Sequence, residues 1–464
     1  MQVRRLFFAT FSAAVLLSAQ IPDFTPPTPL FGAVLRGDVA EAKRLLDSGA
    51  NPNEGRFIGA APLTLALMRN DFDIARAMLA KGADAKALDG GGSSTLMWAA
   101  TSETADVSMI EELLRVGVDP NLANKSGDTA LSWALRRGYT PVVESLKAHG
   151  ASDKAAVKQS IDKAIALMQK SGPEFSKVSS CSSCHHQSLP QMAYSKARER
   201  GFATDPQVSE QQIKSVIAMF RPARESMLEG KPNIPDPSLS VSYSLLGLAA
   251  EGYKPDSTTE AMAHIVSLQQ LPDGSFTVLP ARPPMESSAV SATAISLRAL
   301  QLYGKNPEPQ VMRARDWLRT VTPKTGEERS MQVLGLAWSK ASADDLRKPV
   351  SSLVSEQRPD GGWAQLAALE SDAYATGQAL VALQLAGVPV SDQAYQRGVA
   401  FLLRTQRPDG SWLVRSRSFP FQPYRESGFP HGKDQWISAS GTAWAVMALT
   451  LTAPPQAGQI SQVF

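Results

Sequence analysis

Both cysteines of the chain and two of its five histidines fall within six consecutive residues. These residues, 181–186, have the sequence Cys-Ser-Ser-Cys-His-His. A Cys-x-x-Cys-His sequence is typical of covalent haem attachment, because two thiols one helical turn apart can add to the two vinyl groups of a haem while the adjacent imidazole reaches the iron. We therefore expect haem c here, with thioether bonds to Cys181 and Cys184 and with His185 as the proximal ligand.

Two other interpretations use the same residues. A Cys-x-x-Cys pair is also the usual first half of a tetrahedral zinc site, whose other ligands would be His185 or His186 and the distant His431. A disulfide between Cys181 and Cys184 is the third interpretation, but it would leave both histidines unexplained. Taken alone, His186 is more typical of a packing or hydrogen-bonding residue than of a ligand. The sequence predicts haem, with zinc as the alternative.

The N-terminal segment is typical of an exported protein. Two arginines precede an apolar run over residues 6–17, and small residues follow at positions 18 and 19. This is the order of a secretory signal, which we expect to span residues 1–19 and to be cleaved. No later stretch is long and apolar enough to predict a membrane span. We expect a periplasmic or secreted protein.

Length and charge limit the other classes of protein. A chain of 464 residues is too long for one ordinary core, so two or three domains are expected. The net charge is only +3, and the lysines and arginines are mixed with acidic residues. Neither nucleic acid nor an anionic membrane is favoured as a partner.

A repeat organises the first part of the chain. The glycines that close each unit lie 33, 35 and 33 residues apart, at Gly49, Gly82, Gly117 and Gly150. The other half of the unit recurs with the same spacing in the segments 62–66, 95–99 and 129–134. This pattern resembles the ankyrin repeat, which implies four helix pairs over residues 25–152. The resemblance implies binding of a protein partner, or of another part of the chain, and no chemistry.

A different motif recurs in the last part of the chain. The sequence Gln-x-Pro-Asp-Gly-x-aromatic occurs at residues 270–276, 357–363 and 406–412. Pro-Asp-Gly predicts a tight turn, and the aromatic residue would cover the apolar surface beside it. The motif resembles the repeats of squalene-hopene cyclases, which implies an α/α-toroid, a ring of inner and outer helices, over residues 155–455. The whole chain is thus expected to be all-α, an ankyrin-repeat solenoid followed by a terpenoid cyclase-like toroid.

The same resemblance bears on activity. The cyclases carry an Asp-x-Asp-Asp acid motif at the head of their central cavity, and this chain lacks it. Near the expected starts of inner helices it has Glu286 and Asp372 instead. A buried carboxyl group can act as a general acid, but a negative charge in a first helical turn also suits the helix dipole. Glu286 and Asp372 are therefore the weak catalytic candidates of a chain that, on its missing motif, is expected not to be a cyclase.

The expected toroid gives the cysteine motif a place. Amphipathic helices are predicted at residues 157–170 and 189–200, so residues 173–188 are the predicted connection between them. In later repeats this connection carries the Pro-Asp-Gly turn. The cysteine motif thus replaces one turn of the toroid, at the end of the helical barrel.

A Pro- and Gly-rich segment over residues 419–436 is too irregular for a helix and too long for a turn, and such loops are commonly functional. The first and last repeats of a closed ring are neighbours. We therefore expect this loop to lie against residues 181–186 and to offer His431 as the opposing metal ligand, with Met192 behind it.

Three functions follow from these features. The first is an exported redox or haem-sensing protein, whose ankyrin repeats dock a protein partner and which has an electron-transfer partner. The second is a terpenoid cyclase-like enzyme with altered acid groups. The third is an interaction scaffold whose cysteines hold zinc or stabilise a loop. A haem absorption spectrum would separate the first from the other two.

Overall fold

The computed structural model describes residues 26–454, apart from 58, 103–105, 139, 153, 180–182, 232–233, 280–281 and 420–423. The predicted signal sequence and Cys181 therefore lie outside the described residues. Within them the regular elements are helices, and the β-bridges are isolated pairs. The all-α prediction is confirmed. Contacts group the chain into two compact units, residues 1–90 and 91–464.

The first unit contains two helix pairs, α1 (Pro29–Arg36) with α2 (Val39–Asp47), and α3 (Pro62–Met68) with α4 (Phe72–Ala80). Both α1 and α3 begin with a proline, whose missing N–H costs nothing in a first turn. Helix α1 packs on α3, and α2 packs on α4. Asn53 joins the two pairs, because its Nδ2 donates to the Gly82 carbonyl (3.0 Å) and its Oδ1 accepts from the Asp84 N–H (2.7 Å).

The second unit begins with two further pairs, α5 (Thr95–Ala99) with α6 (Val107–Arg115), and α7 (Ala130–Leu135) with α8 (Pro141–Ala148). Asn121 repeats the role of Asn53, since its Nδ2 donates to the Gly150 carbonyl (2.9 Å) and its Oδ1 accepts from the Ser152 N–H (2.8 Å). The four repeat glycines have φ between 83° and 91°, which glycine adopts without strain. The ankyrin resemblance is confirmed in these local details.

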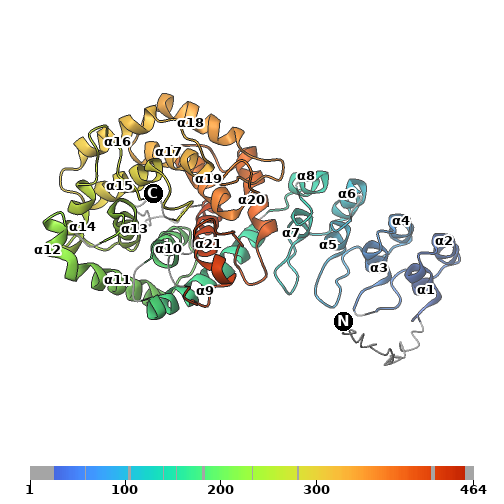
Figure 1. The fold of residues 1–464 in the computed structure, drawn as a ribbon. Coiled ribbons are helices and arrows are strands. Elements are labelled where there is room, and N and C mark those ends of the chain that lie inside the picture. The colour runs from blue at the N-terminus through green and yellow to red at the C-terminus, as the bar shows by residue number, and fades with distance from the viewer. Residues whose placement is uncertain are drawn as a thin grey trace, which may run out of the picture. The chain divides into compact units, whose positions relative to one another are not determined.

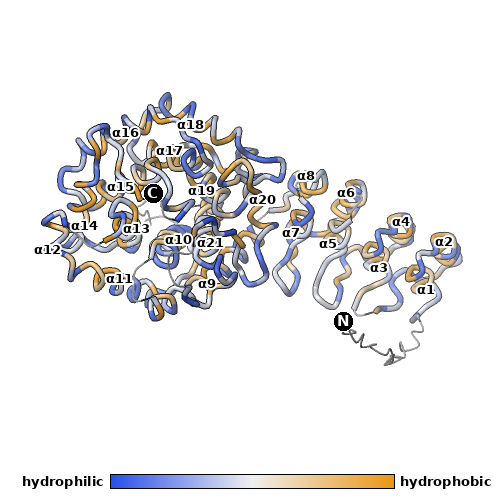
Figure 2. Tube along the Cα trace, viewed as in Figure 1, coloured by the Kyte–Doolittle hydropathy of each residue, from blue (hydrophilic) through white to orange (hydrophobic). Residues whose placement is uncertain are grey.

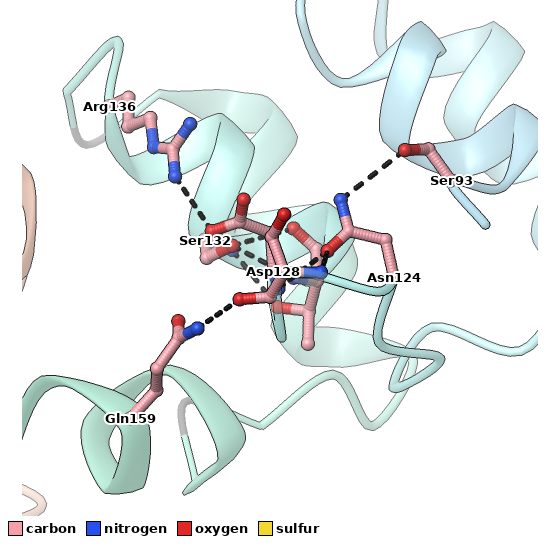
Figure 3. A network of polar contacts seen from close by, with 8 residues as sticks. Ser93, Asn124, Asp128, Ser132, Arg136 and Gln159 are labelled. Atoms are coloured by element: carbon pink, nitrogen blue, oxygen red, sulfur yellow. Dashed lines mark hydrogen bonds and ion pairs between the residues drawn. The ribbon is translucent and has the colours of Figure 1, made fainter. Parts of the chain in front are cut away.

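Polar side chains join the fourth repeat to the third and to the helix that follows (Figure 3). Asn124 Oδ1 accepts from the Asp128 N–H (2.9 Å), and Asn124 Nδ2 donates to Ser93 Oγ (3.3 Å). The Arg136 guanidinium pairs with the Asp128 carboxylate at 2.6 Å. Gln159, on helix α9 (Lys154–Ser179), donates to the Ser126 carbonyl of the same loop. Within the second unit, the last repeat is therefore tied directly to the ring of helices.

The remaining helices form a ring with two layers (Figure 1). The inner layer consists of α10 (Leu189–Glu199), α13 (Pro237–Ala250), α15 (Ala289–Tyr303), α17 (Gly326–Trp338), α19 (Ala373–Leu385) and α21 (Gln435–Thr450). The outer layer consists of α9 (Lys154–Ser179), α11 (Pro206–Phe220), α12 (Arg224–Leu228), α14 (Ser257–Ser267), α16 (Glu308–Thr320), α18 (Ala343–Ser355) and α20 (Gln393–Thr405). Each inner helix packs on the next, and α21 packs on α10, so the ring is closed.

Sequence composition separates the two layers. The inner helices are rich in alanine, serine and leucine and are buried on nearly every side. The outer helices α11 and α18 alternate between hydrophobic and hydrophilic residues (Figure 2), as expected for helices with one face on the ring and one in solvent. Small residues allow the inner helices to approach closely. At Gly377 of α19, an added Cβ would lie 2.5 Å from the backbone of Trp444 in α21.

The recurring Gln-x-Pro-Asp-Gly turns connect outer to inner helices and also join neighbouring repeats. In the last turn, Gln406 Nε2 donates to the Gly410 carbonyl within the turn (3.0 Å) and to the Ser160 carbonyl of α9 (2.9 Å). Gln270 and Gln357 make the same pair of bonds, each to its own turn and to the next outer helix. The ring therefore closes through the same interaction that joins its internal repeats.

The aromatic residue of each turn is buried and bonded in the same way. The backbone N–H of Trp412 donates to Thr442 Oγ1 of the following inner helix (3.3 Å), and its indole N–H donates to the Leu402 carbonyl (2.8 Å). Trp363 repeats both bonds, and Phe276 repeats the first. The predicted role of the aromatic residues is confirmed.

One predicted boundary was wrong. Residues 173–188 were expected to form a connection, but helix α9 continues through Pro173 to Ser179. The residue before a proline usually leaves the helical region because its Cβ meets the proline ring. Here that residue is Gly172, which has no Cβ, so the helix can continue.

We predict that Gln406→Leu will lower the free energy of unfolding by about 1–3 kcal/mol, because two carbonyls lose their donor where the ring closes. Urea denaturation followed by circular dichroism measures this change. Gln207→Leu, at an exposed position of α11, is the control and should be close to neutral. Equal stability of the Gln406 variant and the wild type would contradict the role given to this bond.

Candidate functional site

The described part of the cysteine motif forms a short π-helix, Cys184–Ser188, between α9 and α10. Ser183 caps it, since its Oγ accepts from the His186 N–H at 3.1 Å. Gln187 fixes it to α9, because its Oε1 accepts from the Ser183 N–H (2.5 Å) and its Nε2 donates to Ser176 Oγ (2.9 Å). π-Helical turns are rare and frequently occur at functional sites. The motif therefore stands where an outer helix passes to an inner one, as predicted.

The side chains of this turn are buried. Cys184, His185 and His186 are 8%, 6% and 1% exposed. The ring of Phe175 stacks on His186 with centroids 4.6 Å apart, and it meets His185 edge-on at 5.1 Å. Trp436, at the start of α21, lies 6.0 Å from His185. Apolar aromatic surface thus covers both imidazoles.

The Pro- and Gly-rich segment 419–436, the closing loop, was predicted to lie against the cysteine motif, and this is confirmed for the described parts of both. Ser427 Oγ lies 2.9 Å from Nε2 of His186, and the Arg425 guanidinium donates to the Val178 carbonyl at 2.6 Å. The two segments are separated by more than 240 residues in the sequence. The packing of α21 on α9 and α10 brings them together.

A chain of short polar contacts runs through this junction. Nδ1 of His185 lies 2.5 Å from Nδ1 of His186. Ser427 Oγ donates to Gln435 Oε1 at 2.6 Å, and Gln435 Nε2 donates to the Arg425 carbonyl at 2.6 Å. Both nitrogens of His186 are therefore engaged with protein partners. In this series of contacts, His186 therefore acts as a hydrogen-bonding residue.

His431 lies on the closing loop but is bonded elsewhere. Its Nε2 is 2.7 Å from Ser411 Oγ, in the last Pro-Asp-Gly turn. The other predicted metal residue, Met192, is fully buried in α10. Across the described ranges, no group of three His, Cys, Asp or Glu side chains is arranged to hold a metal ion. Cys181 is not among those residues, so this finding does not cover the complete motif.

Burial keeps the side chains of Cys184, His185 and His186 neutral. Desolvation, and then the charge of Glu286, raise the pKa of the Cys184 thiol to about 12. Desolvation lowers the pKa of His186 to about 3 and that of His185 well below its usual value. Both imidazoles are thus uncharged near neutral pH. Glu286 itself pairs with Arg282 at 2.7 Å.

The predicted candidate Asp372 caps an inner helix. Its Oδ1 accepts from the Ala375 N–H at 2.9 Å, and its Oδ2 accepts from Gln365 Nε2 at 2.8 Å. Burial raises its pKa to about 6. The capping role agrees with the helix-dipole interpretation of this carboxylate.

A buried carboxyl group that sequence reasoning missed lies on α17. Glu327 is 2% exposed, and its Oε1 accepts from Tyr374 Oη (3.2 Å) and Ser291 Oγ (3.4 Å). Among the residues that the structure describes, its Oε2 has no hydrogen-bond partner. Burial raises its pKa to about 8, so the carboxyl holds a proton near neutral pH. The sequence could have indicated Glu327 through its position in the first turn of an inner helix. This helix was not identified as the others were, because its repeat lacks the Pro-Asp-Gly turn.

We predict that Glu327→Gln will remove part of the pH dependence of stability. The pKa of Glu327 is higher in the folded state than its usual 4.5, so the contribution of this carboxyl group to stability should fall as pH rises from about 5 to 8. Glutamine imitates the protonated acid at every pH. Over this pH range, the free energy of unfolding of the variant, relative to that of the wild type, should therefore rise by on the order of 1–3 kcal/mol.

Chemical denaturation at several pH values measures this difference. Glu308→Gln, on the exposed surface of α16, is the matched control and should follow the wild type. Parallel curves for Glu327→Gln and the wild type would show that this carboxyl is ionised in the folded protein.

Comparisons with known proteins agree with both parts of the fold. Residues 325–462 match the family model of the squalene-hopene cyclase C-terminal domain. The chain is 33% identical over 125 residues to ankyrin repeat domain-containing protein 63 of Mus musculus, which covers 26% of this chain and 32% of that protein. It is 32% identical over 122 residues to ankyrin repeat, SAM and basic leucine zipper domain-containing protein 1 of Dasypus novemcinctus, covering 26% of this chain and 25% of that protein.

The chain thus spans a third or less of the length of these relatives. In the part of the chain that the structure describes, no helix has the length and hydrophobicity needed to cross a membrane. The molecule combines ankyrin repeats with a closed helical ring similar to the C-terminal domain of squalene-hopene cyclases.

Proposed function

We propose that the chain is an exported haem c protein in which the junction of the helical ring holds the haem and the ankyrin repeats dock a protein partner. Cys181 and Cys184 would hold the haem through thioether bonds, and the imidazole of His185 would bind its iron. The observation that supports this most directly is the buried Cys184-His185 turn, enclosed by Phe175 and Trp436 where the ring closes. The role is electron transfer or haem-based sensing.

The donor residues fit this group. A thioether sulfur carries no charge, so the burial of Cys184 does not oppose it. A neutral imidazole is the form that binds iron, and the apolar surroundings of His185 favour that form. When bound, haem supplies one-electron chemistry, and a buried apolar environment with defined hydrogen bonds to the ligand influences its potential.

Zinc fits the same residues less well. Zinc binds cysteine as the thiolate, and the buried surroundings of Cys184, next to the carboxylate of Glu286, disfavour that charge. The proposed distant ligand His431 is bonded to Ser411, and both nitrogens of His186 have protein partners. These contacts favour haem over a tetrahedral Cys2His2 site.

The ankyrin repeats supply the interaction part of the proposal. Such repeats stack into extended surfaces that bind other proteins. The fourth repeat is bonded to the ring through Gln159 of α9, which donates to the Ser126 carbonyl, and through Lys147, whose Nζ donates to Gln396 of α20 at 3.1 Å. A partner bound there would be held close to the ring and, in an electron-transfer role, could exchange electrons with its haem.

The first test is production of the full chain in a periplasm that contains haem-attachment machinery. We expect a haem band that remains with the polypeptide after denaturation, and a c-type absorption spectrum. Cys181→Ala or Cys184→Ala should weaken or abolish covalent attachment, since each removes one thioether. Stoichiometric zinc without haem would overturn the proposal.

His264→Ala serves as the matched control. This exposed histidine on the outer helix α14 lies away from the cysteine motif in sequence and should not alter haem content. A loss of haem in this variant equal to that in the cysteine variants would indicate a general folding defect.

The cyclase-like alternative gains one observation, the protonated carboxyl of Glu327 in the inner ring. A buried acid of this kind could protonate an alkene. Because the chain lacks the acid triad of the cyclases, we predict that squalene and similar polyprenes remain unchanged on incubation with the purified protein. A cyclised product that disappears in Glu327→Gln or Asp372→Asn would reverse this prediction.

A further inference from the structure

The hydrogen bonds at the ring junction define which atoms carry protons, starting from Gln435. Its amide nitrogen donates to the Arg425 carbonyl, which can only accept. Its Oε1 accepts from the Ser427 N–H at 3.2 Å and from Ser427 Oγ at 2.6 Å. If the amide were flipped, its oxygen would face the Arg425 carbonyl oxygen, which is also an acceptor, and its NH2 group would face the Ser427 N–H, which is also a donor. The orientation of Gln435 is therefore fixed.

The Ser427 hydroxyl has one proton, and this proton lies between its Oγ and Gln435 Oε1. The same Oγ accepts from the Phe429 N–H at 3.3 Å. Its remaining neighbour is Nε2 of His186, 2.9 Å away. Since Oγ has no further proton to donate, Nε2 of His186 must be the donor.

His186 is 1% exposed and lies against the rings of Phe175 and Phe429, and such apolar surroundings favour the neutral imidazole, which has a proton on only one nitrogen. With that proton on Nε2, its Nδ1 presents a lone pair. The short contact between the two Nδ1 atoms then requires the proton to come from His185. A neutral His185 protonated on Nδ1 has a lone pair on Nε2.

We propose that the series Gln435, Ser427 and His186 holds His185 in the Nδ1–H tautomer, which leaves Nε2 as the atom that binds the haem iron. His186, Ser427 and Gln435 are positioning residues, and His186 is not a ligand. The proton arrangement is a property of the chain itself. Its use as an iron ligand rests on the proposed function.

The same series couples the ligand to ring closure. His185 and His186 precede α10, whereas Ser427 and Gln435 belong to the closing loop and the start of α21. The correct tautomer is thus assembled only when the last inner helix packs on the first. A hydrogen bond from Nδ1–H to a neighbouring acceptor also raises the basicity of a ligating imidazole.

The test uses the full-length chain labelled with nitrogen-15 in histidine and made without haem-attachment machinery. Long-range proton–nitrogen spectra distinguish the two neutral tautomers of each ring. We expect His185 as Nδ1–H and His186 as Nε2–H in the wild type. Ser427→Ala should convert His186 to a mixture of tautomers, because its Nε2–H loses its acceptor.

Ser411→Ala is the matched control, since it removes the corresponding hydroxyl contact of His431 and leaves the ring junction intact. It should change the His431 signals alone. A wild-type His185 protonated on Nε2, or a Ser427→Ala spectrum identical to that of the wild type, would overturn the inference. This outcome does not depend on haem.

The haem-loaded protein provides the second readout. His186→Leu should retain covalent haem but raise its midpoint potential, because the axial imidazole loses the acceptor that makes it more basic. An unchanged potential with full haem content would reject the positioning role. A wild type without haem would reject the proposed function, and the tautomers of the haem-free chain would still decide the proton arrangement.

Discussion

The structure depends on the contact between the last inner helix and the first. Helix α21 packs on α10 and on the outer helix α9, and Gln406 fixes this junction to the Ser160 carbonyl. The cysteine turn and the closing loop meet only because of this packing. A site built here combines residues from the two ends of a domain of about 300 residues. Its geometry therefore reports on the integrity of the entire ring.

Close packing of the inner helices also determines the electrostatics. These helices expose almost no surface, so their polar side chains must find partners inside the protein or remain neutral. Glu327 keeps its proton, and His185 and His186 stay uncharged, for the same reason. Asp372 reduces the cost of burial differently, because it accepts the N–H of Ala375 at the start of α19. One physical condition, exclusion of water from the ring, accounts for each of these states.

Local sequence signals predicted much of this arrangement. The repeat glycines, such as Gly49, identified helix ends that need positive φ, and each Gln-x-Pro-Asp-Gly motif identified a turn. The proximity of the closing loop to the cysteine motif followed from the topology of a ring. The partners inside that junction could not be predicted, because nothing in the sequence pairs Ser427 with His186 across 241 residues. The continuation of α9 was missed because proline was given more weight than the glycine before it.

The turn glutamines have a consequence for how such a ring can be connected. Gln406 bonds to α9 just as Gln270 and Gln357 bond to the outer helices that follow them in sequence. The junction between the two ends of the ring thus uses the same glutamine contact as two junctions within the ring. Circular permutants opened between α16 and α17, where no such turn occurs, would retain every one of these glutamine contacts. The order of helices in the gene is then only one of several orders that can encode the same closed ring.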